Sequence, residues 1–154
     1  MGRSGSLQDR ILLEKISKEI RPVIEGMGYS LVEIKVGRSR GISKVSVVIY
    51  SNRGVTLKNC EDISRLIYPS LEVMEEIPDL TLEVSSPGID RVLKDDREYE
   101  IFNGRGLQII IKETNEVVQG ILINADNDYI SLKNGDIIKR YRKDSIRKAR
   151  LRDF

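Results

Sequence analysis

A basic segment near the carboxyl end holds the residues whose types and spacing best suit chemistry with a ligand. Residues 139–154 contain eight Lys or Arg against two Asp or Glu, whereas the 154-residue chain has a net charge of only +2. The basic residues are Lys139, Arg140, Arg142, Lys143, Arg147, Lys148, Arg150 and Arg152, with Tyr141 among them. Clustered cations suit phosphate groups, and a tyrosine among them suits stacking on an unpaired base. The segment therefore predicts contact with a nucleic acid, although an exposed sheet edge protected by Lys and Arg would have the same composition.

Two smaller basic groups are further candidates for this contact. They are Arg38, Arg40 and Lys44 around the segment GRSRG, and Arg91 and Lys94 after the segment SSPG. Glycines at both ends of GRSRG predict a mobile loop over residues 37–41 that permits close approach of the backbone. Both groups are also compatible with ordinary exposed loops.

The composition argues against catalysis. The chain has no histidine, the commonest general acid or base, and a single cysteine, Cys60, which excludes an intrachain disulfide and any multi-cysteine metal site. It contains no G-x-S-x-G, Ser-x-x-Lys, P-loop or G-x-G-x-x-G motif. We therefore expect neither an enzyme nor a cofactor, a metal or a small-molecule substrate.

The first half alternates helical and strand periods. Apolar residues at three- or four-residue steps predict a helix with Leu13, Ile16, Ile20, Ile24 and Met27 on one face, bent or restarted at Pro22. Two alternating runs, Val32 to Val36 and Val45 to Ile49, predict a β-hairpin. A second helix begins after Thr56, presents Cys60, Ile63, Ile67, Leu71 and Met74, and is interrupted at Pro69. Leu80, Leu82 and Val84 alternate as a third strand, so the expected order is α-β-β-α-β, a three-stranded sheet covered by two helices.

The second half predicts β structure. Asp95 and Glu98 have capping-box spacing before a short helical turn. Five short strands follow, and Asn134-Gly135 lies where a two-residue type I′ hairpin needs it. Five strands in about fifty residues indicate a small closed barrel of the SH3-like or Sm-like kind, because closure removes exposed edges. The fold class is α+β, with predicted domains at residues 7–89 and 90–154; residues 1–6 are left outside the fold.

A joint between the two halves is predicted at the segment LEVSSPGIDRVL, residues 82–93. Pro87 and Gly88 favour a type II turn across residues 86–89. The joint residues are Ser85, Ser86, Pro87, Gly88, Asp90 and Arg91. Such a segment serves either as a plain linker or as a stiff connection that sets how two binding surfaces face each other.

The joint segment resembles the motif L-E-V-S-S-P-G-[IL]-D-R-P-L of the ribosome maturation factor RimP family, departing from it at Val92, where the family usually has proline. Phe102, Gly104, Gly120 and the final IRKARL also fit the family pattern, so the resemblance extends over nearly the whole chain after residue 6. It implies a first domain related to the bacterial type of KH domain, although no G-x-x-G loop lies between the two helices.

The resemblance implies a non-catalytic factor for maturation of the small (30S) ribosomal subunit. Its partners would be 16S rRNA and small-subunit ribosomal proteins, including small-subunit ribosomal protein twelve, which the family is described as engaging through its barrel. We expect a cytoplasmic protein, because no apolar run has membrane-spanning length and charged residues break the N-terminal stretch. A monomer is the default expectation.

Two other functions remain open from the sequence. A general single-stranded RNA-binding module of Sm-like type would assemble into rings, which a large extra domain fits poorly. A protein adaptor that grips peptides as SH3 domains do would need an aromatic-lined groove.

Overall fold

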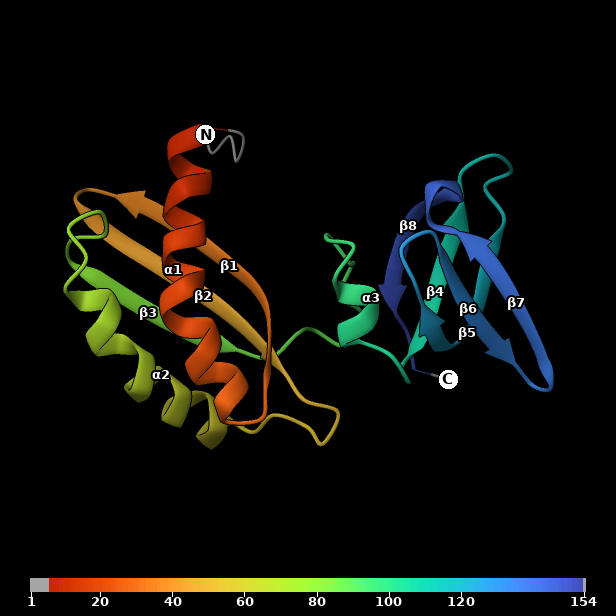
Figure 1. The fold of residues 1–154 in the computed structure, drawn as a ribbon, viewed down its shortest axis with the longest axis horizontal. Helices are drawn as coiled ribbons and strands as arrows, with labels where there is room; N and C mark the ends of the chain where they lie inside the picture. Colours follow the sequence, from red (N-terminus) through yellow and green to blue (C-terminus); the bar gives the residue numbers. More distant parts are fainter. Residues whose placement is uncertain (1–5, 154) are drawn as a thin grey trace. The chain divides into compact units, whose positions relative to one another are not determined.

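The chain forms two compact units in the computed structural model, which describes residues 6–153 (Figure 1). One unit extends to Pro87 and the other begins at Gly88. The limits 7–89 and 90–154 stay predictions about independently folding domains. Residues 1–5 and Phe154 lie outside the described part, but Ser6, which the sequence interpretation left out, caps the first helix: its Oγ accepts a hydrogen bond from Asp9 N at 3.0 Å.

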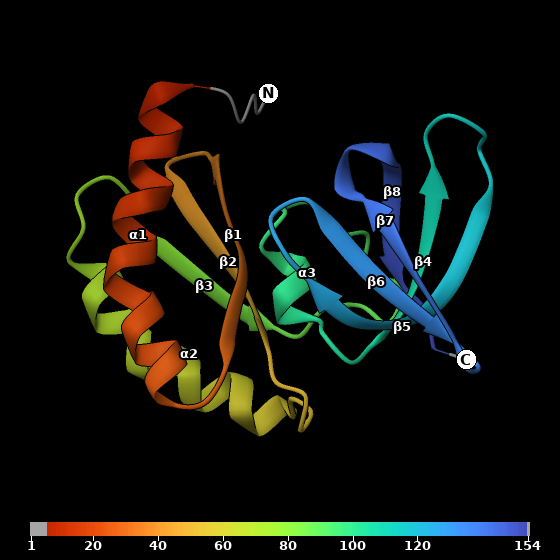
Figure 2. The same ribbon diagram turned by 45° about the vertical axis from the view of Figure 1, so that its right-hand side comes forward.

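The first unit is a three-stranded sheet covered on one face by two helices. Its elements are α1 (Leu7–Gly26), β1 (Ser30–Ser39), β2 (Ile42–Tyr50), α2 (Leu57–Glu72) and β3 (Leu80–Ser85). The strand order is β1-β2-β3, with β1 and β2 antiparallel and β2 and β3 parallel. Figures 1 and 2 show α1 and α2 on the same side of this sheet. The predicted α-β-β-α-β order is confirmed.

The core of this unit consists of the helical faces packed on β2. The five residues predicted for the second helical face are all buried, and burial raises the pKa of the Cys60 thiol. On α1, Ile16, Ile20 and Ile24 are buried as predicted. Leu12 is buried in place of the predicted Leu13, which is only half-buried, and Met27 is 49 % exposed.

Two prolines lie inside the helices without ending them. Pro22 lies within α1 and Pro69 within α2, so neither the predicted restart nor the predicted interruption occurs. Proline has no backbone N–H, so each one removes one hydrogen bond of its helix. Burial of the apolar side chains before and after the proline stabilises the helix by more than this loss.

The β1–β2 hairpin ends in a tight turn. Ser39 pairs with Ile42, and Arg40 and Gly41 between them have φ values of 54° and 81°. Positive φ at both central residues is typical of a type I′ turn. The predicted loop over residues 37–41 is therefore wrong, because Gly37 and Arg38 belong to β1 and pair with residues of β2.

The turn at the joint lies two residues later than predicted. Ser85 ends β3, and Ser86 and Pro87 follow as irregular chain. Arg91 N donates to Gly88 O at 3.1 Å, so the chain turns across Gly88 to Arg91. Gly88 does not have the positive φ of a type II turn, which corrects that prediction.

The second unit is a five-stranded antiparallel sheet with two short helices. Its elements are α3 (Glu98–Ile101), β4 (Gly106–Ile111), β5 (Val117–Ala125), β6 (Tyr129–Asn134), β7 (Ile137–Arg142), the 3-10 helix η1 (Lys143–Ser145) and β8 (Ile146–Leu151). The strand order is β7-β6-β5-β4-β8, and all pairs are antiparallel.

The closed barrel predicted for this unit is not confirmed. Edge strands β7 and β8 are not paired with each other in the part of the chain that the structure describes. The edge of β8 is protected differently: Leu93 N donates to Ala149 O and Leu151 N donates to Arg91 O, both at 2.9 Å. The end of the joint, residues 91–93, thus covers an edge that barrel closure would have removed.

The β6–β7 hairpin is confirmed, with its turn shifted by one residue. Asn134 pairs with Ile137, so the turn residues are Gly135 and Asp136 rather than Asn134 and Gly135. Of these two turn residues only Gly135 has a positive φ, 62°, which fits a type II′ turn with glycine at its first central position.

Gly120 allows β5 and β6 to approach closely. A Cβ added at Gly120 would lie 3.0 Å from both Leu132 Cβ and the Lys133 carbonyl oxygen. Because β6 would have to give by a few tenths of an ångström, we predict that Gly120→Ala lowers the free energy of unfolding by about 1–3 kcal/mol in urea titrations. Gly37→Ala is the matched control, since Gly37 has open space around its Cα. Equal stabilities of the two variants would contradict this interpretation.

Candidate nucleic-acid interface

The five-stranded sheet has a buried inner face and a polar outer face, because successive side chains alternate along each strand. The inner face carries Leu107, Ile109, Leu122, Ile130, Leu132, Ala149 and Leu151, all buried. By the strand register, the outer face carries Tyr129, Ser131 and Lys133 of β6, Ile138, Arg140 and Arg142 of β7, and Lys148 and Arg150 of β8. We call Arg140, Arg142, Lys148 and Arg150 the outer-face cations.

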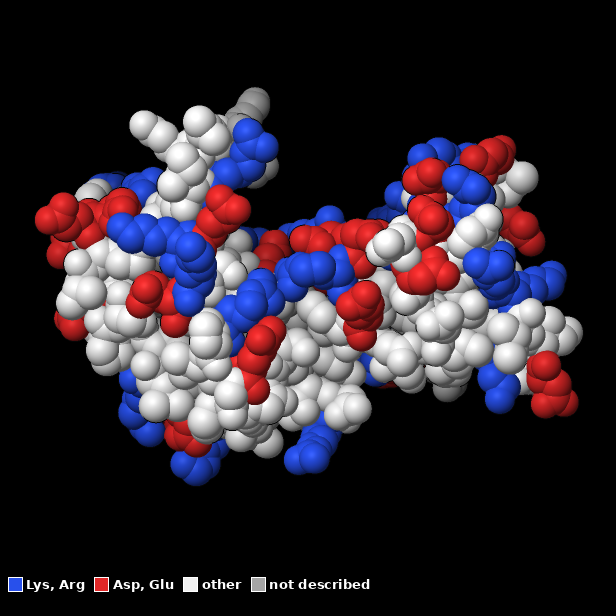
Figure 3. Space-filling view, viewed as in Figure 1, with Lys and Arg blue, Asp and Glu red and all other residues white. Residues whose placement is uncertain are grey.

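On β7, two of these cations surround one tyrosine. Arg142 pairs with Tyr129 across the strands, and its Cζ lies 5.7 Å from the ring centroid. Arg140 is one step further along the same face, with its Cζ 4.0 Å from that centroid. Figure 3 shows Lys and Arg side chains over β7, at the right-hand edge of that view. This geometry is a cation–π contact, worth about 0.5–1 kcal/mol at an exposed site.

Asp126 fixes the turn that presents Tyr129. Its Oδ1 accepts hydrogen bonds from Asp128 N at 2.9 Å and Tyr129 N at 2.8 Å. These backbone hydrogen bonds, and more weakly the charge of Arg140, hold the pKa of Asp126 below its ordinary value. The carboxylate therefore stays charged and the turn stays closed at neutral pH, and this contribution is lost only as pH falls through the lowered pKa.

The ion pairs of these two arginines are exposed. Arg140 lies 4.0 Å from Asp126, and Arg142 lies 3.4 Å from Asp144. Contacts with the Tyr129 hydroxyl and with Asp144 raise the pKa of Arg142. Exposed pairs contribute little to stability, so both guanidinium groups can exchange these partners for a phosphate.

Lys148 and Arg150 lie on the outer face of β8, opposite Ile110 and Gln108 of β4. Both side chains are half-buried. Since β7 and β8 are the two edge strands, the outer-face cations form two groups on one face of the sheet.

Lys139 and Tyr141 lie on the other face of β7. With Glu116, Val117 and Ile137 they line a groove of about 350 Å³. Burial, and to a smaller extent the charge of Glu116, raises the pKa of Tyr141. The aromatic residue beside Arg140 and Arg142 is therefore Tyr129 and not Tyr141, the tyrosine that the sequence indicated.

Lys143 is held inside the second unit. Its Nζ donates to Asp96 at 3.0 Å and lies 5.4 Å from the Tyr99 ring centroid, and its side chain is only 12 % exposed. Burial, aided by the charges of Asp96 and Glu98, raises the pKa of Tyr99 to about 12. Lys143 and Tyr99 line a depression of about 190 Å³, which is also lined by Lys94, Arg147 and Lys148.

Arg91 is committed to a buried ion pair. Its Nε donates to Glu98 Oε1 at 2.7 Å and its Nη2 to Oε2 at 3.0 Å, with the side chains 9 % and 1 % exposed. Glu98 also accepts from Lys94 N, while Asp95 accepts from Arg97 N. The predicted capping box is therefore wrong: α3 begins at Glu98, and its N-cap residue is Arg97.

The hairpin residues belong to the first unit. Arg38 Nη2 donates to the Glu76 carbonyl oxygen at 2.8 Å, and Lys44 Nζ lies 3.4 Å from Glu83. Arg40 occupies the exposed turn. Together with Lys44 it remains a candidate contact.

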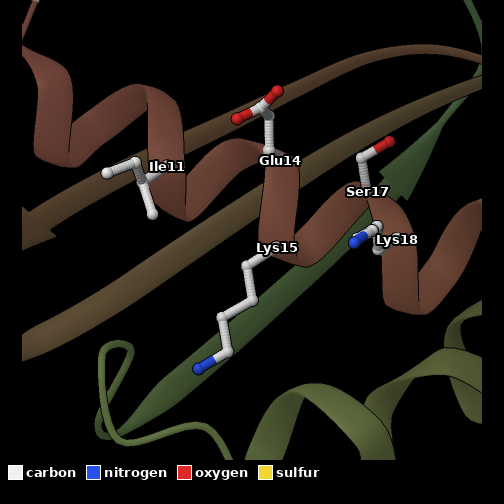
Figure 4. A pocket seen from close by; sticks show the side chains of 5 residues that line it. All are labelled: Ile11, Glu14, Lys15, Ser17 and Lys18. Atoms are coloured by element: carbon white, nitrogen blue, oxygen red, sulfur yellow. The ribbon is translucent and has the colours of Figure 1, made fainter.

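A depression of about 510 Å³ on the first unit is lined by residues of α1 alone, namely Ile11, Glu14, Lys15, Ser17 and Lys18 (Figure 4). Lys15 extends toward the loop before β3, where its Nζ lies 2.6 Å from Glu76 Oε2. Between residues 6 and 153, no cluster of three His, Cys, Asp or Glu could hold a metal ion. No helix in the described chain is long and apolar enough to cross a membrane.

The first unit and the joint match a known domain. Residues 19–90 match the RimP N-terminal domain. The chain is also 29 % identical over 132 residues to the Ribosome maturation factor RimP of Borrelia turicatae (strain 91E135), covering 86 % of this chain and 90 % of that protein. The chain is therefore similar to RimP proteins over most of its length.

This similarity confirms the resemblance to RimP noted from the sequence, and the structure accounts for the departure at Val92. The bridge between Val92 and Arg150 uses the N–H of Leu93 and the carbonyl of Arg91, not the N–H of Val92. A proline at this position would therefore remove no hydrogen bond of this bridge, and the exchange of proline for valine leaves the protection of β8 unchanged.

Proposed function

We propose that this protein is a ribosome maturation factor that binds the immature small (30S) subunit without catalysis. The similarity to the RimP of Borrelia turicatae over 86 % of the chain carries the proposal. The outer-face cations and Tyr129 support it, because cations beside an exposed aromatic ring suit RNA.

In this mechanism the outer-face cations attract the 16S rRNA backbone, and Arg40 and Lys44 of the hairpin provide a second contact. Because both units belong to one chain, binding of one raises the effective concentration of the other, so two weak contacts add. The joint residues, from Ser85 to Arg91, tether the two contacts. Ribosomal proteins such as small-subunit protein twelve are further proposed partners of a monomeric, cytoplasmic factor.

The decisive experiment sediments lysates of wild-type and gene-deleted cells on sucrose gradients. We expect the tagged protein to migrate with free small subunits and not with complete ribosomes. Deletion should cause immature small subunits to accumulate. Small-subunit assembly at a normal pace in the deleted strain would refute the proposal.

A general single-stranded RNA-binding protein is the second candidate, favoured by the exposed arginine beside Tyr129. It predicts that most of the protein migrates with messenger RNA or free RNA. The same gradients separate the two functions.

A further inference from the structure

We propose that the Arg140 guanidinium, held over the Tyr129 ring, is a stacking platform for one unpaired RNA base. This inference rests on the proposed function and deepens it by naming the chemical group that the outer face of β7 recognises. Its basis is the position of Arg140 between a fixed aromatic ring and open solvent.

The platform is preorganised by its neighbours. The centroid of the ring lies 4.0 Å from the guanidinium carbon, and Asp126 in the β5–β6 turn lies 4.0 Å from Arg140 Nη2. Tyr129 is itself held by the hydrogen bond from its N–H to Asp126. An arginine already held on a ring loses less side-chain freedom when it binds, which favours affinity.

The side of Arg140 away from the ring remains open. Its side chain is 61 % exposed although one side packs on Tyr129. The guanidinium is planar and weakly hydrated, so it stacks on flat rings, and bases are flat rings. A base placed there would complete a tyrosine–arginine–base stack.

Polar groups lie in the same row of the sheet. Arg140 pairs with Ser131 of β6, and Ser131 pairs with Asn124 of β5. The exposed Asn124 amide can donate to and accept from a base edge. Arg142 and Lys133 on the same face supply charges for the phosphates on either side.

These features favour RNA over a peptide as the occupant. A peptide would be expected in the groove on the other face of β7, which is lined by Val117, Ile137 and Tyr141. At Arg140 the surface offers a charged planar group and, in the same row, the exposed Asn124 amide, which suit a base.

The test compares two fluorescently labelled single-stranded RNA decamers, one of mixed sequence and one with abasic residues at its central positions. The wild-type protein should bind the base-bearing RNA about tenfold more tightly, since stacking of one base contributes roughly this factor. Arg140→Lys keeps the charge but loses the planar group, so it should remove this preference and leave abasic binding and its salt dependence unchanged. Tyr129→Leu should act likewise, and Tyr129→Phe should keep the preference.

Arg65→Lys is the matched control, because Arg65 is an exposed arginine paired with Asp62 at 3.4 Å and lies on α2. It should bind both RNAs as the wild type does. Equal binding of the two RNAs by the wild type, or an equal loss of preference in Arg65→Lys, would overturn the proposal while leaving the sedimentation result intact. Subunit binding that needs Arg140 without any binding of RNA decamers would also overturn it, and would assign the site to a ribosomal protein.

Discussion

Replacing Arg91 with alanine is expected to lower the free energy of unfolding of the second unit by about 3–5 kcal/mol. The substitution leaves the Glu98 carboxylate, 1 % exposed, without the two guanidinium hydrogen bonds of 2.7 and 3.0 Å. An uncompensated buried charge costs this much, and a small domain has only about 5–15 kcal/mol in total. Hydrogen exchange should show faster opening of residues 106–151 and unchanged protection of α1 and β2.

Two controls separate the buried charge from simple loss of an arginine. Arg142→Ala removes an exposed partner of Asp144 and should cost less than about 1 kcal/mol. The double variant Arg91→Met with Glu98→Leu replaces the pair by apolar side chains and should be more stable than Arg91→Ala alone. A loss below about 1 kcal/mol in Arg91→Ala would mean that water reaches Glu98.

Elements with a strong local period could be predicted from the sequence. The face of α2 from Cys60 to Leu71 and the alternation of Val45, Val47 and Ile49 are buried as expected, and Met74 is buried just after the helix ends at Glu72. In these segments the spacing of the apolar residues matches the period of the helix or strand, and the same spacing places them on the face that packs in the core. Turn positions were less accurate, because a glycine fits more than one turn type: Gly88 and Gly135 each occupy a different place in their turns from the predicted one.

The candidate site could be predicted only in part, because it depends on strand register. Tyr141 is adjacent to Arg140 and Arg142 in sequence but lies on the other face, whereas Tyr129 contacts them from the neighbouring strand β6. Counting alternate positions from Ile130, an apolar residue that must face the core, would have identified Tyr129 once the hairpin was known.

Buried charge was the other feature that the sequence did not signal. Arg91 and Lys143 were candidates for phosphate contact, but they are held by Glu98 and Asp96. Composition gives the number of cations, while burial decides which of them remain free to bind RNA.

Reversing the charge of the outer-face cations, by changing Arg140, Arg142, Lys148 and Arg150 to glutamate, should weaken binding to immature small subunits roughly a thousandfold. Each lost contact with a phosphate in water contributes about 1 kcal/mol, and four losses add to about this factor. The slope of log affinity against log salt should fall by about 0.7 for each contact with single-stranded RNA. The measurement is quantitative co-sedimentation at several salt concentrations.

A matched control must carry the same change of net charge on another surface. Changing Arg10, Lys18, Lys58 and Arg65 to glutamate does so, because these side chains are exposed on α1 and α2 of the first unit. If binding follows net charge alone, both quadruple variants lose equal affinity, and the outer face of the second unit has no special role. If the outer face is the contact surface, the control keeps most of the wild-type affinity and its salt slope. A variant of the outer-face cations that binds as the wild type does would assign RNA contact to the hairpin of the first unit instead.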